Sequence, residues 1–147
     1  MLKQFLDKQA QVDTRLVDIE RTFTIEVDNF KIFGVIDRVD MDDNGDYIVV
    51  DYKTSISEKN KDSLRRDLQL LVYYDAVHKL YNKVPRLVGH WYLVSDNVVS
   101  VIPTTEDLKE IRSRIMSICT SIVTEQFEPV KSSSCNFCDY KLLCPKW

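Results

Sequence analysis

The spacing of hydrophobic positions changes character several times along this chain of 147 residues. Helical spacing over residues 2–20, marked by Leu2, Phe5, Leu6, Leu16 and Ile19, predicts an N-terminal helix. Three runs rich in β-branched and aromatic residues follow, separated by D-N and D-N-G turn signals, and we place strands at 22–27, 31–41 and 46–52. Short turns between consecutive strands indicate an antiparallel meander.

The second half of the chain predicts two long helices with two strands between them. The first helix, at residues 57–82, carries a hydrophobic stripe formed by Leu64, Leu68, Leu71, Val72, Val77 and Leu80. Strands follow at 87–94 and 97–102. The second helix spans about 106–126, with Thr104 or Thr105 as its cap and a core stripe of Leu108, Ile111, Ile115, Ile118 and Ile122. This order of elements predicts an α/β protein, with a mixed sheet flanked by helices.

Composition and charge favour a globular domain over a membrane-spanning or strongly basic protein. A chain that is 44% hydrophobic and 29% charged is typical of a globular domain. We expect one core over residues 1–130, with residues 131–147 as a cysteine-rich tail packed on the same domain. No apolar run reaches membrane-spanning length, which predicts a cytoplasmic protein without a membrane partner. The net charge of −3 argues weakly against broad electrostatic binding of nucleic acid.

The most informative chemistry lies in G-V-I-D-R-V-D and V-V-D-Y-K-T, on the second and third predicted strands. Asp37 ends one apolar run, and Asp51 and Lys53 lie two residues apart on the next strand, so their side chains point to the same face. Two carboxylates that share a divalent cation beside an ammonium group form a site for metal-assisted hydrolysis of a phosphodiester. In the alternative interpretation, Asp37 pairs with Arg38 or Arg21, and Asp51 forms a surface salt bridge with Lys53. The combination favours the functional interpretation.

These motifs resemble the RecB-type branch of the PD-(D/E)XK nuclease superfamily, which includes the CRISPR-associated RecB-like nucleases. The resemblance implies a restriction-endonuclease-like fold and a metal-dependent DNA nuclease that acts on ends or single strands in repair, recombination, or phage or CRISPR DNA processing. It implies that Asp37, Asp51 and the backbone carbonyl of Tyr52 bind Mg²⁺ or Mn²⁺, and that Lys53 assists catalysis.

The family also has a Q-x-x-x-Y motif on the helix after the D-x-K strand, and this chain has Gln69 and Tyr73 there. A spacing of four residues places both side chains on one helix face, where they could contact a phosphate or the attacking water. The alternative is that Tyr73 packs in the core with Gln69 at its edge. Four basic residues near the start of the same predicted helix are either DNA contacts or a solvated face: Lys59, Lys61, Arg65 and Arg66.

The tail carries Cys135, Cys138 and Cys144 in a C-x2-C-x5-C pattern. Three thiolates at this spacing could bind zinc or an iron–sulfur cluster. The tail resembles the iron–sulfur staple of the RecB-like nucleases, which implies a structural 4Fe-4S cluster. The fourth cluster cysteine of that family lies upstream, whereas this chain has none before Cys119, which is either a core residue or a replacement ligand.

The N-terminal part of the family pattern, with its metal-binding His, is missing, and the resemblance covers about residues 20–147. His78 and His90 both follow Lys53 and are interpreted as structural. We therefore consider a homo-oligomer or a partner chain as the source of the missing segment, and Glu20 or Glu26 as a replacement metal ligand. Two other hypotheses remain: a catalytically impaired module that binds DNA or a partner protein, and a zinc-stapled DNA-binding protein.

Overall fold

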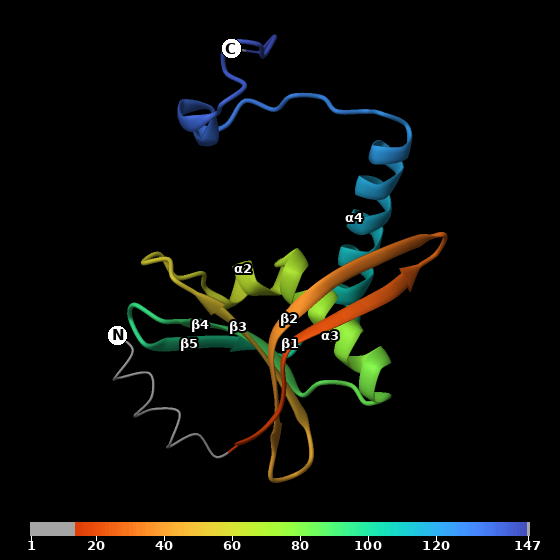
Figure 1. Ribbon diagram of the computed structural model, residues 1–147, viewed down its shortest axis with the longest axis vertical. Coiled ribbons are helices and arrows are strands. Elements are labelled where there is room, and N and C mark those ends of the chain that lie inside the picture. Colours follow the sequence, from red (N-terminus) through yellow and green to blue (C-terminus); the bar gives the residue numbers. More distant parts are fainter. Residues whose placement is uncertain (1–13, 147) are drawn as a thin grey trace. The chain divides into compact units, whose positions relative to one another are not determined.

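The computed structural model describes residues 14–146, which form one five-stranded sheet, three α-helices and one 3-10 helix (Figure 1). The strands are β1 (Thr14–Val27), β2 (Phe30–Asp42), β3 (Tyr47–Lys53), β4 (Leu87–Tyr92) and β5 (Asn97–Val101). The helices are α2 (Lys61–Arg65), α3 (Leu68–Tyr81), α4 (Thr105–Val123) and the 3-10 helix η1 (Ser133–Phe137). The predicted α/β class is confirmed.

The strands lie in the sheet in the order in which they occur along the chain, from β1 to β5. The first three pair antiparallel, which confirms the predicted meander, and β5 pairs antiparallel with β4. Strands β3 and β4 are parallel. Parallel neighbours need a crossover connection. Helices α2 and α3 form this connection, which brings the chain back to the end of the sheet where β3 begins. The sheet is therefore mixed, as predicted.

The prediction of an N-terminal helix at residues 2–20 was wrong for the part that the structure describes. Residues 14–20 belong to β1 and pair with the end of β2, with Thr14 opposite Asp42. The register shifts between Leu16 and Asp18, and Leu16 and Ile19 are exposed rather than packed as a helical stripe. Pairing with a neighbouring strand outweighs a weak helical spacing here. Residues 2–13 of the predicted helix lie outside the described residues.

The helix predicted over residues 57–82 is divided into α2 and α3. Asp67 interrupts it, because the Asp67 carboxylate accepts hydrogen bonds from the backbone N–H groups of Gln69 and Leu70 and so caps a new helix. Helix α3 ends at Asn82, which has left-handed backbone geometry. Of the predicted stripe, Leu64, Leu71, Val72 and Val77 are buried.

Helix α4 is preceded by a reciprocal cap, which identifies Thr104, one of the two predicted candidates, as the capping residue. Thr104 Oγ1 accepts from the backbone N–H of Asp107, and the Asp107 carboxylate accepts from the backbone N–H of Thr104. The predicted core stripe is buried at Ile111 and Ile115, but Ile118 and Ile122 are exposed, so that part of the prediction was wrong. The spacing of apolar residues defines a helix face, and only tertiary packing decides whether the face is covered.

The chain divides into two compact units, Met1–Ser113 and Arg114–Trp147. In the first unit, α3 packs against β1, β3 and β4, and the core lies between this helix and the sheet. The described part of the chain contains no helix that is both long enough and apolar enough to span a membrane.

Candidate active site

The parallel register of β3 and β4 sets the geometry of the candidate site. It places Asp51 directly opposite His90 and Lys53 opposite Tyr92. Because alternate residues of a strand share a face, all four side chains lie on the same side of the sheet. The motif strand thus meets a histidine and a tyrosine that come much later in the sequence.

Asp51 and Lys53 form an ion pair at the end of β3. Nζ of Lys53 lies 2.6 Å from Oδ2 of Asp51, and Asp51 is only 1% exposed. That oxygen nevertheless has no well-oriented hydrogen-bond donor among the described residues. Burial raises the pKa of Asp51, and the neighbouring Lys53 opposes this increase without cancelling it. A buried carboxylate that is only partly compensated is suited to a cation.

Asp37 reaches the same strand end from β2. Its Oδ2 accepts a hydrogen bond of 2.9 Å from the backbone N–H of Tyr52, the residue between Asp51 and Lys53. The two arginines considered as structural partners of Asp37 form other ion pairs: Arg38 with Asp40 at 2.7 Å, and Arg21 with Asp18 at 3.9 Å. The structure therefore brings the two motif carboxylates and the lysine to one place.

Gln69 and Tyr73 extend this site from α3. Nζ of Lys53 donates to Oε1 of Gln69 at 2.9 Å, and Nε2 of Gln69 donates to the Tyr73 hydroxyl at 2.9 Å. Tyr73 is 6% exposed, and burial raises its pKa, so the phenol is neutral. Tyr73 packs in the core, as the alternative interpretation expects, and its hydroxyl joins the Lys53 network. The contact of Gln69 and Tyr73 with a phosphate or the attacking water stays a prediction.

Gly34, the glycine of the G-V-I-D-R-V-D motif, leaves space for the Phe23 ring, which in turn contacts Tyr73. Gly34 on β2 pairs with Phe23 on β1, and a Cβ atom at Gly34 would lie 2.7 Å from Cζ of the Phe23 ring. The ring lies edge-on to Tyr73, with centroids 5.9 Å apart. Only glycine therefore lets Phe23 lie flat on β2 and support the tyrosine.

The sequence analysis did not place three polar residues next to the site, namely His90, which it interpreted as structural, Asp67 and Tyr92. His90 is fully buried, and its Nε2 lies 3.7 Å from Oδ2 of Asp51 and 3.7 Å from Oδ2 of Asp67. Burial lowers the pKa of His90 to about 4, although the nearby Asp67 carboxylate opposes this decrease. In the sequence, His90 is marked only by its position in the strand that follows α3. This position indicates nearness to Asp51 only when the register of β3 and β4 is known.

The donor set fits a divalent cation that keeps water and phosphate ligands. Among residues 14–146, no three His, Cys, Asp or Glu side chains are placed to hold one metal ion. Mg²⁺, however, is usually bound by one or two carboxylates, with water and substrate phosphate completing its shell. The buried carboxylate of Asp51, whose charge Lys53 compensates only in part, and the adjacent Asp37 meet that requirement.

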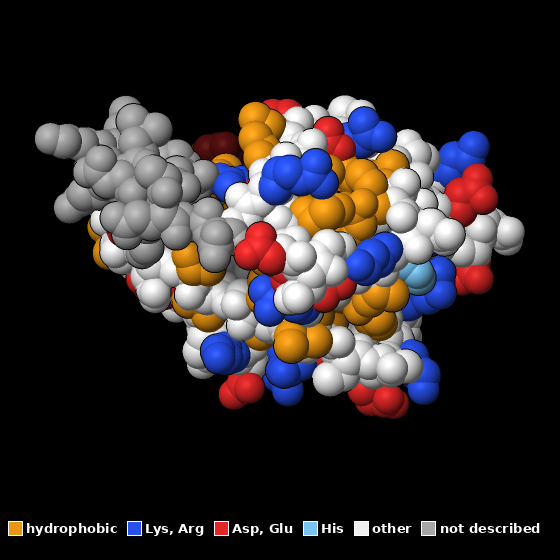
Figure 2. Space-filling model, turned by 90° about the horizontal axis from the view of Figure 1, so that it is seen from below, with side chains coloured by type: hydrophobic (Ala, Val, Ile, Leu, Met, Phe, Trp, Pro, Cys, Tyr) orange, Lys and Arg blue, Asp and Glu red, His pale blue; other side chains and the backbone are white. Residues whose placement is uncertain are grey.

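The four basic residues considered as DNA contacts have different environments. Nζ of Lys59 lies 2.6 Å from Oδ2 of Asp67, and Arg65 pairs with Asp107 at 3.0 Å. Lys61 and Arg66 are exposed. Figure 2 shows one face of the molecule, on which basic and acidic side chains are interspersed, with hydrophobic side chains between them. Two of the four cations therefore already have carboxylate partners.

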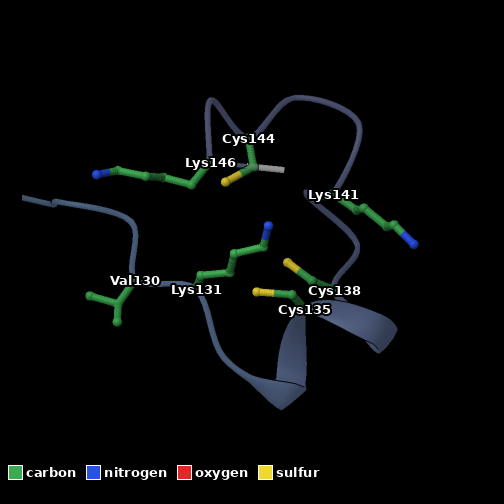
Figure 3. Close-up of a pocket in the computed structure, with 7 residues that line it drawn as sticks. All are labelled: Val130, Lys131, Cys135, Cys138, Lys141, Cys144 and Lys146. Carbon is green, nitrogen blue, oxygen red and sulfur yellow. The ribbon is translucent and has the colours of Figure 1, made fainter.

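Three cysteines of the second unit line one pocket, together with Val130 and the lysines Lys131, Lys141 and Lys146 (Figure 3). The sulfur atoms of Cys135, Cys138 and Cys144 face the pocket, and the Lys131 side chain extends into the space between them. Cys119 is half-buried and does not line this pocket. The thiols gather as the spacing predicts, but they are not arranged to hold a metal ion.

The mixed sheet, with two carboxylates and a lysine at the end of its central strand, defines an α/β protein of the restriction-endonuclease-like kind. The family model of the PD-(D/E)XK nuclease superfamily matches residues 1–145, so the chain belongs to this superfamily. Its members are generally metal-dependent nucleases that use Mg²⁺ or Mn²⁺. The match is wider than the expected resemblance over residues 20–147, and the RecB-type branch stays a prediction.

The crystal structure of SSO0001 has a similar fold, with a TM-score of 0.58 and 19% sequence identity. The similarity covers 99% of this chain and 68% of that one. At this identity the likeness concerns the fold alone. No curated protein matches the chain.

Proposed function

We propose that this protein is a divalent-metal-dependent deoxyribonuclease. The observation that carries the proposal is the continuous set of contacts from Asp51 to Lys53, Gln69 and Tyr73, beside Asp37. Lys53 is held between the buried carboxylate of Asp51 and the side-chain amide of Gln69. An ammonium group fixed in this way is suited to contact a phosphate. Superfamily membership supports the same class of reaction.

Each residue has a distinct task in this proposal. Asp37, Asp51 and the carbonyl of Tyr52 would hold Mg²⁺ or Mn²⁺, which supplies charge neutralisation at the phosphate and an acidified water. Lys53 would orient the nucleophile or stabilise the negative charge that develops on the scissile phosphate. Gln69 keeps the Lys53 ammonium in place, and Tyr73 fixes the orientation of the Gln69 amide.

The finer assignment rests on the resemblance to the RecB-type branch. We propose action on DNA ends or single strands, in repair, recombination, or phage or CRISPR DNA processing. The exposed cations Lys61 and Arg66 would contact DNA, and Lys59 and Arg65 would do so only by leaving their carboxylate partners. A second candidate is a catalytically impaired module that binds DNA or a partner. The absence of a third acidic or histidine ligand within residues 14–146 favours this second candidate.

One experiment separates the two candidates. End-labelled single- and double-stranded DNA is incubated with the protein and Mn²⁺, Mg²⁺ or EDTA, alongside Lys53→Ala. Lys109→Ala is the matched control, since Lys109 lies in an exposed pair with Glu106 on α4. The nuclease proposal expects cutting that needs metal, disappears in Lys53→Ala and persists in Lys109→Ala. No cutting by well-folded wild-type protein would favour the impaired module, and cutting retained by Lys53→Ala would overturn the assignment of the site.

For the second unit we propose that the three cysteines bind zinc or a 4Fe-4S cluster with a structural role. Their shared pocket supports this, but Lys131 would have to leave the space between the sulfur atoms. Anaerobic purification followed by elemental analysis tests the proposal. Iron with sulfide, or zinc, near one site per chain is expected, and protein free of both elements would refute it.

A further inference from the structure

His90 has a buried ring nitrogen that makes no hydrogen bond among the described residues. Its ring is 0% exposed, and Nε2 has no hydrogen-bond partner among the described residues. Two carboxylate oxygens, Oδ2 of Asp51 and Oδ2 of Asp67, each lie 3.7 Å from Nε2. Buried polar groups are normally satisfied, so a nitrogen placed midway between two carboxylates calls for a functional explanation.

The groups around His90 favour a proton on Nε2 rather than on Nδ1. The Tyr92 hydroxyl accepts from the backbone N–H of Lys59 at 2.7 Å, so its own proton is available for Nδ1 of His90, at 3.3 Å. A neutral imidazole has one donor and one acceptor. With Nδ1 as acceptor, the proton is on Nε2 and points between the carboxylates. The opposite tautomer would direct a nitrogen lone pair at two negative charges.

We propose that His90 is a positioning residue of the active site, whose Nε2–H group holds the carboxylates of Asp51 and Asp67 in a fixed relation. The inference deepens the proposed function and rests on it for the role of Asp51. With Oδ2 of Asp51 turned towards His90 and Lys53, its Oδ1 is the oxygen left to face a cation. The distance of 3.7 Å exceeds a hydrogen bond, and we expect it to shorten when a cation fixes Asp51.

The position of Asp67 gives this contact a wider consequence. Asp67 caps α3, the helix that carries Gln69 and Tyr73, and also pairs with Lys59. His90 therefore links the acid at the end of β3 to the start of the helix that orients Lys53. Outer contacts of this kind tune metal ligands, and their loss typically costs about 10- to 100-fold in metal affinity or activity.

The first test reads the tautomer directly in the full, metal-free chain. The chain has 2 histidines, so ¹⁵N-histidine labelling gives two sets of imidazole signals, and the exposed His78 provides the reference. The expected result at neutral pH is a His90 ring protonated at Nε2 only. Protonation at Nδ1, or at both nitrogens, would overturn the inference. This measurement needs no variant and no metal.

The second test measures Mn²⁺ affinity by titration calorimetry. His90→Leu removes the donor and is expected to weaken binding by about 10-fold or more. His90→Gln restores an N–H near the position of Nε2 and is expected to recover most of the affinity, while His78→Leu is the matched control. Wild-type affinity in a folded His90→Leu, or a His90→Gln as weak as His90→Leu, would overturn the inference. Failure of the wild type to bind Mn²⁺ would instead refute the proposed metal site. In that case the tautomer measurement alone would test whether the Nε2–H group of His90 faces Asp51 and Asp67.

Discussion

Lys53 and Asp51 lie two residues apart on β3, and their charged atoms are 2.6 Å from each other. The carboxylate is almost completely buried, whereas the side chain of the lysine is 30% exposed. The pair is therefore asymmetric: the acid is fixed inside the sheet, and the ammonium stands at the surface, where it also reaches Gln69. A cation that binds Asp51 can take over the neutralisation of its charge, which would free Lys53 to face a phosphate.

The burial of ionised Asp51 is expected to lower the free energy of unfolding of the protein. Because the pKa of Asp51 is raised above 3.8, the protonated carboxyl favours the folded state, and its ionisation as pH rises reduces stability. We expect Asp51→Asn to be more stable than the wild type near pH 7 by about 0.5–2 kcal/mol, the usual size of one stabilising change. The difference should vanish below pH 3.8. Urea unfolding at several pH values in EDTA measures this.

The same variant separates metal binding from stability. Mn²⁺ at about 100 times its dissociation constant should stabilise the wild type by about 2.7 kcal/mol and Asp51→Asn by much less. Asp43→Asn, in the exposed turn after β2, is the matched control and should respond as the wild type does. Equal stabilisation of Asp51→Asn and the wild type by Mn²⁺ would show that the cation binds elsewhere.

Tyr73→Phe isolates the hydroxyl that fixes Gln69. The ring and its edge-on contact with Phe23 remain, so the loss of stability should be about 1 kcal/mol or less. DNA cleavage should fall about 10-fold, which corresponds to ~1.4 kcal/mol of transition-state stabilisation. Tyr74→Phe removes a hydroxyl from the neighbouring buried position and should leave cleavage unchanged. If both variants cleave like the wild type, Tyr73 is a core residue only.

Asp67 combines a helix cap with an ion pair, and two substitutions separate these roles. Burial acts to raise the pKa of Asp67, but hydrogen bonds from Lys59 and from the Leu70 N–H outweigh it, so the pKa is lowered. The charged carboxylate therefore stabilises the fold above pH 3.8, and this contribution is lost as pH falls through the lowered pKa. Asp67→Asn should be less stable than the wild type at pH 7, and the gap should close in acid.

Asp67→Ala removes the cap as well. It should be less stable than Asp67→Asn by about 1 kcal/mol, because asparagine caps a helix nearly as well as aspartate does. This second difference should not change with pH. Chemical unfolding of both variants from pH 7 to pH 3 measures the two contributions, and a pH-independent gap between Asp67→Asn and the wild type would contradict the role assigned to the ion pair.

Gly34→Ala should destabilise the fold through a direct clash with the Phe23 ring. The added methyl group would meet the Phe23 ring at 2.7 Å, and overpacking of this kind costs about 1–3 kcal/mol. In a Phe23→Leu background the same substitution should cost much less, since the ring that it strikes is gone. Thermal unfolding of the four proteins completes the cycle, and additive effects would argue against the contact.

Local sequence was sufficient for the meander and the motif residues. Turn signals and β-branched runs predicted β2 and β3, and the alternation of side chains placed Asp51 and Lys53 on one face. The prediction of a helix before β1 was wrong over residues 14–20, because a sparse apolar spacing fits more than one backbone and the partner strand made the choice. The prediction of one long helix at 57–82 was wrong in two respects, since residues 57–60 are not helical and Asp67 caps a second helix inside the range.

The sequence by itself thus determined the strands that carry Asp37, Asp51 and Lys53, since turn residues and a period of two act over a few neighbouring positions. Only the tertiary structure decided that His90, Tyr92 and Asp67 lie beneath them. Their proximity depends on the parallel register of β3 with β4, which is reached through a crossover of two helices. That register joins strands separated by more than thirty residues, so it is a long-range property that no local pattern encodes.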